Sequence, residues 1–202
     1  STLMRSSAAS DVYKRQEMIR IEYSEKGMFE DRPTFTVVNR NLELVDFKKK
    51  EDDRFLYIQT DKVKLKYRKG TNPKTSPASP ENLTITIENH GCETLWYPGK
   101  KDPLNLKGTC RTLDGSNGDN KRSELENGLI SRSGWAVIDD SWEATRADGS
   151  HSFALEPNPE VGYDWWAYRN DPQAIDLYFM GYGNEYKLSL IHISEPTRPE
   201  PI

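Results

Sequence analysis

The chain has 202 residues, and its 28 Lys and Arg residues against 32 Asp and Glu residues give a formal net charge of −4. This mildly acidic balance, with no basic block, excludes the electrostatic signature of a nucleic-acid-binding or membrane-surface protein. Five tryptophans and an aromatic content of 10% argue against disorder, and no apolar run approaches the length of a membrane span. We therefore expect a folded, aromatic-rich domain without a nucleic-acid or membrane partner.

The two ends of the chain are related as opposite strands of one DNA segment. Residues 11–16 can be encoded by gat-gtg-tat-aag-aga-cag, and the reverse complement of this DNA encodes residues 188–193. Both segments resemble a translated sequencing-library adapter. We therefore expect residues 1–16 and 188–202 to be foreign segments that pack on nothing, with the natural domain in residues 17–187. The sequence does not indicate a cellular compartment.

Short segments of alternating apolar and polar residues recur from Ile19 to Tyr182, and no stretch of helical length holds one apolar face. The alternating segments are 19–23, 62–68 and 83–88, and the denser segments 35–38, 55–58, 135–138 and 175–179 are predicted central strands. Many short strands without helices for parallel crossovers favour an all-β fold, an antiparallel β-sandwich. Because the pattern starts abruptly at Ile19, we expect the sandwich to be incomplete on its N-terminal side.

Residues suited to metal binding or acid–base catalysis are few. Residues 17–187 contain two histidines, His90 and His151, and neither has a partner at the spacing of a zinc or catalytic motif. His90 lies in a predicted turn between two strands and His151 follows another, so a structural role is favoured for both. Cys92 and Cys110 could form a disulfide or remain thiols. We expect no metal site and no cofactor.

The aromatic segment 163–171, with the sequence YDWWAYRND, has two interpretations. Aromatic faces beside carboxylates suit sugar rings, because the C–H faces of the ring pack on aromatic faces while the hydroxyls seek polar acceptors. Neighbouring tryptophans are also large apolar side chains for a core or an interdomain contact. Composition alone favours the core or interdomain interpretation.

Segment 125–141 contains a turn, one arginine, a predicted buried strand and two adjacent carboxylates, Asp139 and Asp140. Adjacent residues of a strand point to opposite faces of the sheet. Asp139 and Asp140 are therefore not expected to act as a paired acid and base. A strand-end turn and a hydrogen-bond acceptor are the favoured roles.

Segment 125–141, together with 106–115 and 176–183, resembles the N-terminal domain of glycoside hydrolase family 31, the α-glucosidase and α-xylosidase family. The resemblance extends over nearly all of residues 17–187. It implies a β-sandwich of the galactose-mutarotase-like type, packed on a catalytic (β/α)₈ barrel that follows it in the chain. In this family the barrel supplies both carboxylates of the retaining mechanism, so the chain itself is expected to be inactive.

The resemblance also implies a substrate-binding loop. In the family, the loop that matches residues 131–133 reaches over the barrel and shapes the sugar cleft, often with an aspartate where Ser133 stands. Arg132, Ser133 and Trp135 are therefore the expected carbohydrate-binding residues, with an α-glucoside or α-xyloside as the partner of the parent enzyme. Serine would bond a sugar hydroxyl without charge, which puts a tight contact with the leaving sugar in question.

Two alternatives use the same sequence features. The aromatic segment 163–171 also suits a free-standing carbohydrate-binding module or lectin. A sugar epimerase on the related sandwich fold would need a histidine and a carboxylate that converge on the anomeric centre, and two histidines in predicted turns do not favour it. The reading frame that follows Lys187 would discriminate between the first two functions.

Overall fold

The structure is a computed structural model that describes residues 2–8, 17–38, 40, 46–69, 76, 78–89, 91–108, 125–142 and 151–185. Within these ranges the chain forms strands and turns, with a single short 3-10 helix, η1 Gly183–Glu185. None of the described helical residues could span a membrane. The chain divides into unit 1, Ser1–Phe47, Thr71–Ala78 and Val137–Met180, and unit 2, Lys48–Gly70, Ser79–Ala136 and Gly181–Ile202.

Unit 2 contains a five-stranded antiparallel sheet in which strands follow one another in chain order. The strands are β3 Lys48–Glu51, β4 Phe55–Gln59, β5 Val63–Arg68, β6 Leu83–Asn89 and β7 Cys92–Trp96. Strand β5 alternates strictly between buried and exposed residues. Its buried residues Val63, Leu65 and Tyr67 join Ile58 of β4 on the core face, while the opposite face meets solvent.

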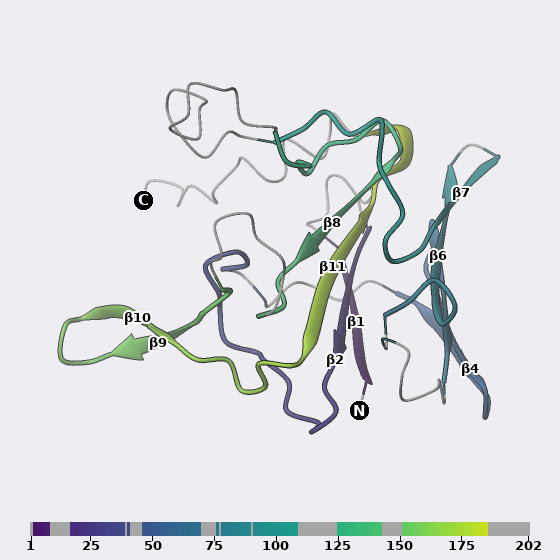
Figure 1. Cartoon of the computed structure of the whole chain (residues 1–202). Helices are drawn as coiled ribbons and strands as arrows, with labels where there is room; N and C mark the ends of the chain where they lie inside the picture. Colours follow the sequence, from purple (N-terminus) through teal and green to yellow (C-terminus); the bar gives the residue numbers. More distant parts are fainter. Residues whose placement is uncertain are drawn as a thin grey trace, which may run out of the picture. The chain divides into compact units, whose positions relative to one another are not determined.

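The second large sheet has the order β1-β2-β11-β8. Its strands are β1 Thr2–Ala8, β2 Glu17–Tyr23, β8 Trp135–Asp139 and β11 Ile175–Gly181. Central strand β11 is buried from Asp176 to Gly181, which places apolar side chains on both of its faces. A two-stranded antiparallel hairpin, β9 Ala154–Asn158 with β10 Tyr163–Ala167, extends away from β2 and β11 (Figure 1).

Most of the predicted strands are present, but the prediction of a central strand at residues 35–38 is wrong. Thr34 forms an isolated bridge to Ala154, and the chain then turns back on itself. The Val37 N–H donates to Thr34 Oγ1 at 3.0 Å, and the Thr34 N–H donates to the Val37 carbonyl oxygen at 3.0 Å. Phe35 and Val38 are consequently exposed, because this closed turn prevents an extended strand.

The expectation that residues 1–16 pack on nothing is wrong for Thr2–Ala8. This segment forms β1 and pairs with β2 in antiparallel register, from Thr2 opposite Tyr23 to Ala8 opposite Glu17. An edge strand presents unpaired backbone groups, so any short segment nearby can pair with it. Residues 188–202 lie outside the described part of the chain.

The all-β, antiparallel fold class is confirmed within the described residues. The five-stranded sheet has one face covered with apolar side chains and an opposite, solvent-exposed face that carries mostly polar ones, which is the arrangement from which β-sandwiches are built.

Unit 1 has a buried ionic network in place of a purely apolar centre. Asp176 accepts two hydrogen bonds from Arg20, at 2.9 and 3.0 Å, one from Arg169 at 2.6 Å and one from Arg40 at 3.0 Å. Asp140 contacts Arg40 and Arg169. Asp176 and Asp140 are both fully buried. Although burial opposes its charge, the arginines around Asp176 hold the pKa of its carboxyl below the usual value.

Glu22 joins this network from β2, but its pKa is shifted upward, whereas that of Asp176 is shifted downward. One carboxylate oxygen accepts the Glu30 N–H at 2.8 Å, and the other lies 2.7 Å from Arg20 Nη2. Burial and the negative charge of Asp176 raise the pKa of Glu22 to about 7, against the opposing charges of Arg20 and Arg169. Because the folded state favours the protonated form, the contribution of Glu22 to stability decreases as pH rises from about 4.5 to about 7.

Glu22→Gln is therefore expected to flatten the dependence of stability on pH. Between pH 5 and pH 8, the free energy of unfolding of the unmodified chain should fall by about 2–3 kcal/mol more than that of the Glu22→Gln variant. Urea denaturation at the two pH values measures this difference, with Glu25→Gln at an exposed position as the control. Equal pH slopes for Glu22→Gln and the unmodified chain would contradict the assignment.

Candidate functional site

The loop that precedes β8 is held by a buried carboxylate of the same unit. Asp102 is 6% exposed, and its Oδ1 accepts the hydroxyl of Ser131 at 2.8 Å and that of Ser133 at 2.6 Å. The Ser133 N–H also donates to Ser131 Oγ at 2.9 Å. Hydrogen bonds to a charged acceptor are stronger than neutral ones. The path of residues 131–133 is therefore fixed by Asp102.

A second polar side chain, Asn105, joins Asp102 to the start of the same loop. Asn105 Nδ2 donates to Asp102 Oδ2 at 3.1 Å and to the Gly128 carbonyl at 3.0 Å, while Asn105 Oδ1 accepts the N–H groups of Lys107 and Gly128. A Cβ at Gly128 would lie 2.6 Å from the Lys107 carbonyl oxygen, so this close approach requires glycine.

Gly134 connects this loop to β8. Its φ is 83°, and a Cβ there would lie 2.9 Å from the Cα of Gly183, so two independent reasons favour glycine. The Tyr182 hydroxyl accepts the Ser131 N–H at 2.6 Å and donates to the Trp135 carbonyl at 3.1 Å. Burial raises the pKa of Tyr182 to about 12, so its hydroxyl stays protonated at neutral pH.

The three residues expected to bind carbohydrate have different environments. The Arg132 side chain is exposed, while its backbone N–H donates to the Leu104 carbonyl at 3.1 Å. No described carboxylate forms an ion pair with Arg132. Ser133 is half-buried, and its hydroxyl proton is directed to Asp102. Arg132 can therefore donate to a ligand, whereas Ser133 can offer only its oxygen as an acceptor.

Trp135 is a core residue rather than a contact surface for a sugar. It begins β8 as expected, but it is only 5% exposed and packs edge-on against Trp96, with ring centroids 6.3 Å apart. Its role as a direct substrate contact is not supported by this burial. It anchors the strand from which the loop of residues 131–133 projects.

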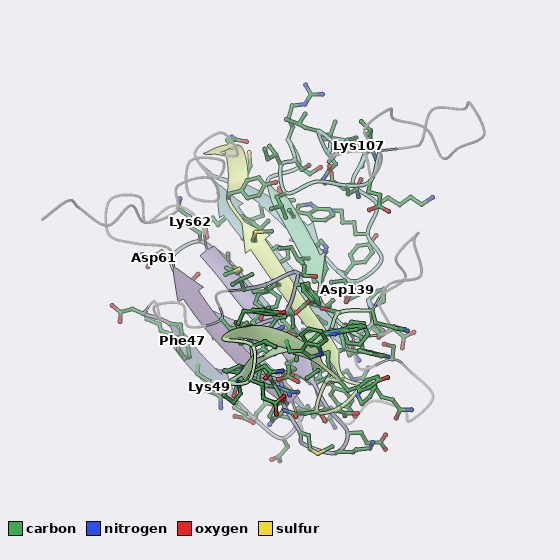
Figure 2. All side chains as sticks on the ribbon, turned by 90° about the vertical axis from the view of Figure 1, so that its left-hand side faces the viewer. Phe47, Lys49, Asp61, Lys62, Lys107 and Asp139 are labelled. Atoms are coloured by element: carbon green, nitrogen blue, oxygen red, sulfur yellow. The ribbon has the colours of Figure 1, made fainter. Side chains whose placement is uncertain are left out.

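The other reactive side chains considered in the sequence differ in burial and in contacts. Asp139, labelled in Figure 2, is exposed at the end of β8, whereas the next residue, Asp140, is buried. These adjacent carboxylates differ in exposure, as expected for opposite faces. The His151 ring stacks on Trp142, with centroids 4.2 Å apart, and its Nδ1 lies 3.0 Å from the Trp142 carbonyl oxygen. Cys92 is an exposed free thiol; Cys110 and His90 lie outside the described residues.

The aromatic segment does not form a core in the described structure. It makes up β10 and the residues after it, where Tyr163, Trp165, Trp166 and Tyr168 are 49–74% exposed. Composition favoured a core or an interdomain contact, but in the described part of the chain no further strand joins this two-stranded hairpin to cover its rings. Contiguous exposed apolar patches are enriched at binding sites.

Trp166 of the hairpin and three rings from the segments next to it form a continuous series, which we call the aromatic platform: Trp142, Phe153, Trp166 and Tyr168. Phe153 lies at the centre, with ring centroids 4.8 Å from both Trp142 and Trp166 and 5.9 Å from Tyr168. Trp165 points to the other face, near Tyr163, with centroids 6.5 Å apart. The exposed faces of Trp166 and Tyr168 can receive the C–H face of a sugar ring.

Comparison with models of protein families finds none that matches this chain, and comparison with curated proteins likewise finds no match. Among the described residues, no three His, Cys, Asp or Glu side chains are grouped so that they could hold a metal ion. The sequence did not point to Asp102 or Asn105 as parts of the site. The available signal was the segment Asp102-Pro-Leu-Asn105, whose residue types favour a turn closed by side-chain oxygens.

Proposed function

We propose that the chain is the non-catalytic N-terminal β-sandwich of a retaining α-glycosidase of the α-glucosidase or α-xylosidase type. In this proposal the domain has the galactose-mutarotase-like fold and packs on a catalytic barrel. The loop of residues 131–133 contributes to the carbohydrate-binding cleft of the parent enzyme. The three sequence motifs that resemble glycoside hydrolase family 31 and the all-β antiparallel fold support it.

The observation that carries the proposal is the fixed loop with an exposed guanidinium. Asp102 and Tyr182 hold the backbone of residues 131–133, while the Arg132 side chain stays free of the described carboxylates. A rigid scaffold that presents one uncompensated donor is suited to orient a sugar hydroxyl. A purely structural arginine would be expected to pair with a neighbouring carboxylate, as Arg20 does with Asp176.

The parent gene, read beyond Lys187 in its source DNA, tests the proposal. We expect an open frame that encodes a (β/α)₈ barrel with two catalytic carboxylates, and an expressed parent that hydrolyses aryl α-glucosides or α-xylosides. The present chain alone is expected to show no turnover, because it lacks those carboxylates. A frame that stops after Lys187, or continues into another binding module, would refute the proposal.

The two exposed rings of the aromatic platform, Trp166 and Tyr168, favour a second candidate, a free-standing carbohydrate-binding module. Trp166 and Tyr168 present ring faces next to Asp164 and Asn170, whose side chains can bond sugar hydroxyls. If the chain is a binding module, the isolated chain should bind a neutral oligosaccharide. If it is an accessory domain, binding should be measurable only when the barrel is also present.

Titration of the purified chain with malto- and xylo-oligosaccharides discriminates between the two candidates. Trp166→Ala removes a ring of the platform, and Trp165→Ala is a matched control on the same strand with nearly equal exposure. Binding that Trp166→Ala abolishes and Trp165→Ala retains would favour the binding module. Absence of binding by the unmodified chain would favour the accessory domain.

A further inference from the structure

The solvent face of the five-stranded sheet gathers cations that are dispersed in the sequence. We call this region the basic face, and it consists of Lys48 and Lys50 of β3, Phe55 and Tyr57 of β4, and Lys66 and Arg68 of β5. Direct cross-strand pairing places Lys50 and Lys66 on either side of Tyr57, and Arg68 opposite Phe55. The side chains of directly paired residues share one face of a sheet. All four cations are exposed.

None of these cations lies within ion-pair distance of a described carboxylate, and the one described electrostatic partner is the exposed Asp52, whose pKa Lys50 helps to lower after its hydrogen bonds from the Phe55 and Arg54 N–H groups. The carboxylate of Glu51 pairs with Lys49 and Lys69, which are not members of the basic face. Lys64, the next cation on β5, pairs with Glu88 at 3.0 Å and Glu93 at 3.6 Å, and this marks the limit of the basic face. Among the described residues, no carboxylate forms an ion pair with Lys48, Lys50, Lys66 or Arg68.

Protection of a sheet edge explains only part of this arrangement. Lysines on an edge strand such as β3 discourage pairing with other chains. Strand β5, however, is the third of five strands and has no free edge, so Lys66 and Arg68 do not serve that purpose. Like charges gathered on one face repel one another, and an anionic ligand would relieve that repulsion.

The basic face also contains the ring of Tyr57 and the hydroxyl of Thr84, and the spacing of a sheet places both close to its cations. Tyr57 is half-buried, and Thr84 of β6 lies directly opposite Lys66, so a hydroxyl continues the line of Lys50, Tyr57 and Lys66. Cβ atoms of opposite residues are about 5 Å apart. Alternate residues of one strand are about 7 Å apart. A sugar ring over Tyr57 would thus have an ammonium group on each side.

We propose that the basic face binds a linear polysaccharide that carries carboxylate groups, of the polyuronate class. One sugar ring packs on Tyr57, and its neighbours place carboxylates at Lys50, Lys66, Lys48 and Arg68, the last of which can bond a carboxylate in bidentate fashion. This binding site is separate from the loop of residues 131–133 and does not depend on the identity of the parent enzyme.

Single-stranded nucleic acid fits the basic face less well. Sheet surfaces that bind single strands stack two or three bases on free aromatic rings. Here the Lys66 ammonium already lies 4.6 Å from the centroid of Phe55, which leaves Tyr57 as the ring available for stacking. The net charge of −4 also disfavours a polymer with a charge on every phosphate.

Calorimetric titration of the purified chain with oligogalacturonate tests the proposal, with malto-oligosaccharide and single-stranded DNA of similar length as comparison probes. Lys50→Ala/Lys66→Ala is expected to weaken oligogalacturonate binding about five- to tenfold at low salt. Lys26→Ala/Lys101→Ala removes two exposed lysines outside the basic face and is expected to leave the affinity unchanged. Because all four lysines are exposed, both variants should fold, and circular dichroism checks this.

Lys48→Ala/Arg68→Ala provides a second test at the two ends of the basic face, with the same expected loss. Four results would overturn the proposal: no binding of oligogalacturonate, equal affinity for malto-oligosaccharide, tighter binding of DNA, or equal losses in the basic-face and control variants. Equal losses would indicate attraction to overall charge rather than to these residues.

Discussion

Replacing Asp176 by alanine is expected to lower the free energy of unfolding by about 3–5 kcal/mol. Asp176 is fully buried and accepts hydrogen bonds from Arg20, Arg40 and Arg169. Its removal leaves three buried guanidinium groups with insufficient negative charge around them. Because a domain of this size is stable by only about 5–15 kcal/mol, the loss approaches the whole stability of the fold.

Urea denaturation followed by far-UV circular dichroism measures this loss. Asp31→Ala is the matched control, since Asp31 lies 3.4 Å from the same Arg20 but its side chain is 60% exposed. Exposed ion pairs contribute about 0–1 kcal/mol, so this control should remain close to the unmodified chain. Similar small effects for both variants would show that the buried network does not stabilise unit 1.

Asp102→Ala is expected to be the second most damaging substitution, with a loss of about 2–4 kcal/mol. It leaves the hydroxyls of Ser131 and Ser133 and one N–H of Asn105 without their acceptor. The same substitution should loosen residues 131–133, because the backbone path of this loop depends on those side chains. Hydrogen exchange at the Ser133 amide should accelerate, since its acceptor, Ser131 Oγ, is no longer held by Asp102.

Asp53→Ala is the control for Asp102→Ala, because Asp53 is an exposed carboxylate of the same unit. Asp102→Asn retains one acceptor oxygen and should recover part of the lost stability. If Asp102→Ala were as stable as Asp53→Ala, with unchanged exchange at Ser133, the carboxylate would not be what holds the loop.

Alternation of apolar and polar residues predicted the strands whose two faces differ. Val63, Leu65 and Tyr67 face the core, while Lys64, Lys66 and Arg68 face solvent, so β5 could be predicted from its sequence. The same rule missed β10, in which Trp165 and Trp166 are adjacent and both exposed. Because neither face of β10 is buried, its sequence does not need to alternate between apolar and polar residues, and alternation cannot predict such a strand.

The motif that surrounds Arg132 and Ser133 made them candidate residues, but it gave no sign of what supports their loop. Asp102 lies far upstream in the sequence and contacts Ser131 and Ser133 only through the fold. The basic face could not be predicted from the sequence for the same reason. Its lysines are separated by apolar residues along each strand and come together only when β3, β4 and β5 pair.

The kinetics of Arg132→Ala in the parent enzyme test whether this β-domain contributes a fixed loop to an α-glycosidase cleft. A hydrogen bond from the guanidinium to the leaving sugar would contribute about 1.5–3 kcal/mol to transition-state stabilisation. We expect kcat/KM for a disaccharide to fall about tenfold or more, with little change for an aryl glycoside that lacks this sugar. Equal losses for both substrates, or a parent protein without glycosidase activity, would contradict this role of the loop.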